Sequence, residues 1–134
     1  MPFSPTFLLI EDNLIDQLVM TQLLKKVLFV HKIHIANNGH EGLQWLKNSK
    51  EADKPLIIIL DIQMPFMNGF EFLKEYDKLD SKLKSETLIY VLSSTLDQEE
   101  INKITENKYV SKMLGKPFPI EEFKEEFYIN IIAS

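Results

Sequence analysis

Cysteine and arginine are both absent from the 134 residues of the chain. Without cysteine, the protein has no disulfide, no thiol nucleophile and no cysteine–zinc site. Without arginine, and with a net charge of −5, it lacks the basic face and the guanidinium forks with which proteins commonly read DNA. We therefore expect no direct binding of nucleic acid.

Long apolar runs are also missing. The longest, residues 56–60, is far shorter than the roughly 20 residues that a membrane-spanning helix needs. No basic segment precedes a long apolar run at the N-terminus, so the first residues do not resemble a signal peptide. We expect a cytoplasmic protein without membrane insertion, and the length fits one domain over residues 1–134.

Five short apolar runs, mostly of β-branched residues and leucine, alternate with segments of helical periodicity. Such runs suit strands that are buried on both faces of a parallel sheet. The alternation predicts an α/β fold, a doubly wound five-stranded parallel sheet with five helices. The expected strands are residues 6–10, 34–36, 56–60, 88–93 and 109–114. In the first helix, we expect an apolar face formed by Leu14, Leu18, Leu23, Leu24, Val27 and Leu28.

Polar residues follow four of the expected strands. Glu11 and Asp12 follow the first strand, Asp61 the third, Ser93 ends the fourth, and Lys116 follows the fifth. In doubly wound folds, ligands bind outside the carboxyl ends of the strands. The sequence therefore predicts that three carboxylates, a hydroxyl and an ammonium meet at one edge of the sheet.

The acidic residues of this group predict a magnesium site. Two carboxylates about 4 Å apart repel by roughly 4 kcal/mol at an effective dielectric of 20, so the cluster needs a cation. Oxygen ligands without histidine or cysteine suit Mg²⁺. Each residue alone also has an ordinary interpretation: Asp12 as a helix cap, Asp61 as a solvated loop carboxylate, and Lys116 as a surface lysine.

Three other classes of protein with similar folds fit the sequence less well. A flavin protein would bind phosphate after the first strand, where Glu11 and Asp12 would repel it. A dinucleotide enzyme would need the pattern G-x-G-x-x-G, which the four glycines do not form. A phosphatase of the haloacid dehalogenase type would carry a second aspartate where the chain has Gln63.

Four segments in order, L-L-I-E-D-N, I-I-I-L-D-I-Q-M-P-F-M-N-G, V-L-S-S-T and L-G-K-P-F, resemble the receiver domain of bacterial two-component response regulators. The resemblance covers nearly the whole chain and implies the flavodoxin-like strand order 2-1-3-4-5. It implies that Asp61 is the phosphoacceptor and that Asp12 binds Mg²⁺ directly. It further implies that Glu11 binds the ion through water and that the Gln63 backbone carbonyl completes the ligands.

The same resemblance assigns Ser93 and Lys116 to the phosphoryl group. It implies a stand-alone receiver without an output domain, whose only chemistry is its own phosphorylation and dephosphorylation at Asp61. The implied partners are a sensor histidine kinase or histidine phosphotransfer protein and a downstream protein. The alternative is a degenerate receiver, an interaction module that works without phosphorylation. Met113 stands where receivers usually carry tyrosine or phenylalanine.

Overall fold

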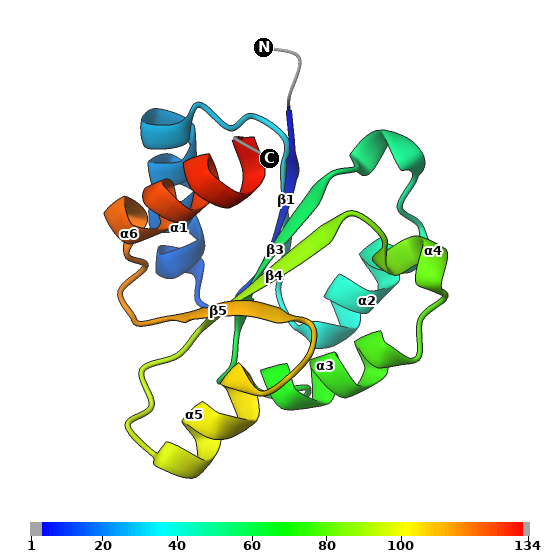
Figure 1. Ribbon diagram of the computed structural model, residues 1–134, viewed down its shortest axis with the longest axis vertical. Coiled ribbons are helices and arrows are strands. Elements are labelled where there is room, and N and C mark those ends of the chain that lie inside the picture. Colours follow the sequence, from blue (N-terminus) through cyan, green and yellow to red (C-terminus); the bar gives the residue numbers. More distant parts are fainter. Residues whose placement is uncertain (1–3, 133–134) are drawn as a thin grey trace.

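The computed structural model describes residues 4–132, which form one parallel sheet with helices on both faces (Figure 1). The strand order is β2-β1-β3-β4-β5, which confirms the expected order. The strands are β1 (Thr6–Ile10), β2 (Ile33–Ala36), β3 (Leu56–Asp61), β4 (Thr87–Leu92) and β5 (Val110–Leu114). The helices are α1 (Leu14–Leu28), α2 (Gly39–Lys47), α3 (Gly69–Asp77), α4 (Ser81–Lys84), α5 (Gln98–Thr105) and α6 (Ile120–Glu126), with short turns η1 (Glu51–Asp53) and η2 (Phe127–Ile132).

Two apolar cores lie on the two faces of the sheet. Successive side chains of a strand point to opposite faces, so Phe7 and Leu9 of β1 face α1 and α6, whereas Leu8 and Ile10 face α2 and α3. In Figure 1, α1 and α6 stand on one side of the sheet and α2 and α3 on the other. No helix within residues 4–132 is long and apolar enough to cross a lipid bilayer.

The two edge strands are less buried than the sequence predicted. β1 and β3 are buried along their whole length, as expected for the middle of a parallel sheet. In β2, His34 and Ile35 are exposed, and β5 is mostly half-buried. Each edge strand has a neighbour on one side only, so part of its surface stays open to solvent.

The expectation of five helices was wrong by one short helix. α4 is a single turn between α3 and β4, and its sequence, Ser-Lys-Leu-Lys, offers too few apolar residues for a helical period. Lys54 secures this turn: its ammonium donates to the Leu83 carbonyl at 2.7 Å and to the Thr87 hydroxyl at 3.0 Å.

The predicted buried face of α1 was also partly wrong. Leu14 and Leu18 are 74% and 61% exposed, while the helix buries Gln17, Met20, Leu24 and Leu28 against the sheet. Both sets have helical spacing. The buried face was not recognised from the sequence because one of its positions holds the polar residue Gln17. Helical periodicity leads one to expect an apolar residue there.

Candidate functional site

The ends of β1 and β3 bring three carboxylates together. Glu11 directly follows β1, Asp12 comes next, and Asp61 is the last residue of β3. One carboxylate oxygen from each residue lies within 4.8 Å of the other two. Glu11 and Asp61 are both only 2% exposed, whereas Asp12 is open to solvent. The predicted convergence of the three acids is therefore observed, with one acid facing the solvent.

Lys116 and the loop after β3 hold the Asp61 carboxylate in place. The Lys116 ammonium lies 2.8 Å from Asp61 Oδ1, and the Gln63 backbone N–H donates to the same oxygen at 3.0 Å. The peptide bond that joins Lys116 to Pro117 is cis. Gln63 thus lies beside the acids, and the role of its carbonyl as a metal ligand stays a prediction.

Ser93 lies one residue beyond the β4 position that pairs with Asp61, which is Leu92. It is 1% exposed, and its backbone N–H donates to the Leu114 carbonyl at 3.0 Å. Its hydroxyl oxygen accepts the Thr95 backbone N–H at 3.1 Å. A buried hydroxyl therefore lies just beyond the end of β4, the strand that pairs with β3, and its action on a phosphoryl group stays a prediction.

Gly69 lets α3 begin close against the end of β3. A Cβ at this position would lie 2.8 Å from the Ile62 Cα and 3.1 Å from the Asp61 carbonyl oxygen. The Gly69 N–H donates to the Ile62 carbonyl at 2.9 Å. The glycine thus allows the loop of residues 62–68 to close tightly beside Asp61.

Burial and negative charge raise the pKa of Glu11 to about 7. Loss of hydration is the larger cause, and the nearby Asp61 adds to it, while the Asn13 backbone N–H and Lys116 act in the opposite direction. Three acids face one ammonium, so negative groups outnumber positive ones at the site, and the excess is largest when Glu11 is ionised. A divalent cation would relieve this repulsion.

The donor set fits Mg²⁺. It offers carboxylate oxygens, and the cluster of possible metal ligands found among residues 4–132 contains neither histidine nor cysteine. Mg²⁺ takes one or two carboxylates from a protein and keeps several waters, which a phosphate can replace. The exposed Asp12 suits a direct ligand, since a hydrated ion can reach it from solvent.

We expect Mg²⁺ to bind several-fold more tightly at pH 8 than at pH 6. Below about pH 7 the Glu11 carboxyl holds a proton, and its charge is then missing from the site. Isothermal titration with MgCl₂ at both pH values measures the difference, and Glu11→Gln should flatten it. In the metal-free protein, the raised pKa lowers the free energy of unfolding as the pH rises from 4.5 to about 7, because the unfolded chain ionises first.

Gln17 and Asn37 are two polar residues near the site that the sequence analysis missed. The Gln17 amide is buried in α1 and donates to the Glu11 carbonyl and to the Asn37 side chain. One signal was available: Gln17 stands three and seven residues before Met20 and Leu24, within a row of helical spacing.

The strand order 2-1-3-4-5 defines a doubly wound α/β protein. At the carboxyl edge of its sheet, three carboxylates and a lysine form an acidic site that could bind a cation. The family model of the response regulator receiver domain matches residues 7–128. The chain therefore belongs to the receiver domain family of two-component signalling, as its motifs predicted.

Relatives in curated proteins agree with this assignment. The chain is 33% identical over 118 residues to "Probable C4-dicarboxylate response regulator DctR" of Bacillus subtilis, covering 88% of this chain and 48% of that protein. It is 32% identical over 117 residues to "Sensor histidine kinase CheAY" of Helicobacter pylori, covering 87% of this chain and 14% of that protein. The chain thus spans about half the length of the Bacillus relative and a small part of the kinase.

Solved structures share the fold. A response regulator receiver protein from Dyadobacter fermentans superposes with a TM-score of 0.84 at 25% identity, covering 93% of this chain and 96% of that chain. A two-component response regulator from Cytophaga hutchinsonii gives a TM-score of 0.82 at 22% identity, covering 98% of both chains.

Proposed function

We propose that this receiver is a phosphorylation switch: Asp61 accepts a phosphoryl group in a Mg²⁺-dependent reaction, and the phosphorylated form changes its binding to a protein partner or passes the group on. The contact that supports the proposal best is the 2.8 Å pair between Lys116 and the buried Asp61 carboxylate, beside Glu11 and Asp12. The protein is not an enzyme in this proposal, because its only substrate is its own aspartate.

The chemistry is an in-line transfer to a carboxylate. An Asp61 oxygen forms a bond to phosphorus as the bond from phosphorus to the donor's imidazole nitrogen breaks, and that nitrogen keeps the electron pair. Such transfers require mainly positioning and neutralisation of charge. In this proposal the Lys116 ammonium, which pairs with Asp61, would contact the phosphoryl oxygens, and the Ser93 hydroxyl would donate a hydrogen bond to one of them. Bound Mg²⁺ would neutralise the charge of the phosphoryl oxygens, with Asp12, Asp61 and the Gln63 carbonyl as ligands and Glu11 acting through water.

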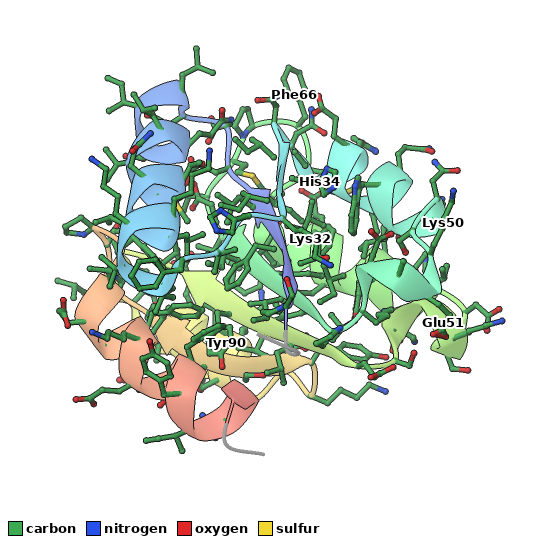
Figure 2. The ribbon with its side chains drawn as sticks, turned by 90° about the horizontal axis from the view of Figure 1, so that it is seen from above. Lys32, His34, Lys50, Glu51, Phe66 and Tyr90 are labelled. Carbon is green, nitrogen blue, oxygen red and sulfur yellow. The ribbon has the colours of Figure 1, made fainter. Side chains whose placement is uncertain are left out.

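Exposed apolar side chains around the site support a protein as the phosphoryl donor. Leu14 and Leu18 on the first turns of α1 are largely exposed, and so is Leu96 after β4. Phe66, in the loop after β3, is 89% exposed, and Figure 2 shows it at the rim of the molecule, directed away from the sheet. A sensor histidine kinase or phosphotransfer protein could cover this rim while it presents its histidine to Asp61.

The lysines of α5, of β5 and of the segment between them give little support for an acidic partner protein. Lys103, Lys108 and Lys112 suggest a basic patch in the sequence, but each has a partner within the chain. Lys103 lies 4.8 Å from the centre of the Phe70 ring, and Lys108 is 3.5 Å from Asp77. Lys112 pairs with two glutamates of α6, at 3.2 and 3.1 Å. The charge and identity of a downstream partner therefore do not follow from these lysines.

Met113→Ala should leave the phosphorylation of Asp61 intact. Met113 is half-buried on β5, pairs with Val91 of β4, and packs against the core under α2 and α3. We expect labelling by acetyl phosphate within about twofold of the parent, and a free energy of unfolding lower by about 1–2 kcal/mol because a partly buried side chain is lost. Urea denaturation and single-turnover labelling measure the two quantities. Loss of labelling by the folded variant would assign Met113 a role in the reaction itself.

Uptake of beryllofluoride tests the proposal directly, since this ion imitates a phosphoryl group on a carboxylate. Fluorine NMR should show a bound signal that requires both Mg²⁺ and Asp61. A receiver that works as a phosphorylation-independent interaction module would show no bound signal at any Mg²⁺ concentration, and this outcome would refute the proposed switch.

A further inference from the structure

Gln17 is a buried amide in an otherwise apolar helix face, and the proposed reaction does not use it. Its Nε2 donates to the backbone carbonyl of Glu11 at 2.6 Å and to Asn37 Oδ1 at 2.8 Å. A side-chain amide nitrogen carries two hydrogens, so these two bonds use both. Gln17 thus joins the turn after β1 to the loop after β2.

Asn37 continues this connection to α2. Its backbone N–H and its side-chain Nδ2 donate to Glu41 Oε1 at 3.0 and 3.1 Å. The resulting chain runs from Glu41 through Asn37 and Gln17 to the Glu11 carbonyl, and we call these three side chains the Gln17 clamp. The clamp links α2, the loop after β2 and α1 to the acidic site.

With the clamp in place, the polar groups of Glu11 are held at three points. Its N–H donates to the Ala36 carbonyl at 3.0 Å, its side chain accepts the Asn13 N–H at 3.0 Å, and its carbonyl accepts from Gln17. The Glu11 carbonyl belongs to the peptide unit that leads into Asp12. Its orientation therefore helps to set the direction in which the chain carries the Asp12 carboxylate.

We propose that Gln17 is a positioning residue for the acidic site, which fixes the Glu11–Asp12 peptide unit so that both carboxylates converge on Asp61. The inference rests on the proposed function, because it assumes that the converging carboxylates bind Mg²⁺. Residues that orient metal ligands without touching the metal commonly change metal affinity by 10–100-fold when they are replaced. The Gln17 clamp contacts the backbone carbonyl of Glu11 and not the carboxylates of the acidic site.

The test is isothermal titration of the purified protein with MgCl₂. Gln17→Met keeps the length of the side chain and removes both hydrogen-bond donors, and we expect affinity about tenfold weaker than in the parent. Asn37→Ala removes one acceptor from an exposed position and should weaken affinity less. In the double variant, the two losses should not add, because both variants break the same bond. Leu28→Ala, at the far end of α1, is the control that lowers the thermal midpoint without changing Mg²⁺ affinity.

Amide hydrogen exchange provides a readout that needs no metal. The Asn13 N–H, bound by the Glu11 side chain, should exchange faster in Gln17→Met than in the parent or in Leu28→Ala. Parental Mg²⁺ affinity in a folded Gln17→Met protein would overturn the inference. Should that variant not fold, parental affinity in Asn37→Ala would overturn it equally. A parent protein that binds no Mg²⁺, or an Asp12→Ala variant that binds as well as the parent, would instead count against the proposed function.

Discussion

Asp61→Asn will abolish phosphoryl incorporation from acetyl phosphate and Mg²⁺, whereas the parent will gain one acid-stable, base-labile phosphoryl group. The amide has no anionic oxygen to attack phosphorus, and the other acids cannot replace it, because Asp61 alone is held by both Lys116 and the Gln63 N–H. Intact-protein mass spectrometry measures the product. We expect a loss of at least about a thousandfold, the size typical of removing a nucleophile.

Asp80→Asn is the matched control for this variant. Asp80 caps α4 through a bond to the Lys82 N–H, and asparagine caps helices as well as aspartate does. The control makes the same chemical change at a distant exposed position and should label like the parent. Circular dichroism should show both variants folded. Labelling of a folded Asp61→Asn protein at the parental rate would show that the phosphoacceptor lies elsewhere.

The strand order and the convergence at the sheet edge could be predicted because both depend on simple patterns. Short apolar runs such as residues 56–60 have few alternatives in an alternating α/β sequence, and parallel strands place all their carboxyl ends on one edge. The first strand was predicted with its observed bounds, Thr6–Ile10. The acids just after β1 and at the end of β3 therefore had to lie close together.

Details that depend on tertiary packing could not be read in the same way. On α1, periodicity allows two apolar rows, and only contact with the sheet decides that Met20 is buried and Leu18 exposed. The α4 turn is held by a hydrogen bond from Lys54 to the carbonyl of Leu83, 29 residues further along the chain. A local sequence pattern therefore does not predict this turn. Helical spacing with Met20 and Leu24 marks Gln17 as a buried position, but its bond to Asn37, 20 residues away, could not be read from that spacing.

Two leucines of α1 that were wrongly predicted to be buried, Leu14 and Leu18, bear on the proposed function. Leu14 and Leu18 were expected on the apolar face of the first helix because of their helical spacing. Their exposure means that they contribute little to the stability of the fold, yet they lie in the helix that begins just after Glu11 and Asp12. Exposed apolar groups that gather at a reactive site suit a protein donor, which must desolvate the site to transfer its phosphoryl group.

Asp12→Ala should weaken Mg²⁺ binding by about a hundredfold, and Glu11→Ala by about tenfold or less. Asp12 is exposed, and in the proposed function it contacts the ion directly, so its loss would remove one of few protein ligands. Glu11 is buried, and its pKa of about 7 leaves it only partly ionised at neutral pH. Its removal also relieves repulsion with Asp61, which offsets part of the loss.

Isothermal titration at pH 8, where Glu11 is mostly ionised, gives the fairest comparison of these two variants. Asp16→Ala supplies the control, since Asp16 is an exposed acid in the first turn of α1 outside the cluster of three carboxylates. It should bind Mg²⁺ nearly as the parent does, which separates direct ligation from general negative charge. Unchanged affinity in both Asp12→Ala and Glu11→Ala would reduce the two acids to structural roles at the start of α1. The reverse ranking, with Glu11→Ala the weaker binder, would make the buried carboxylate the direct ligand.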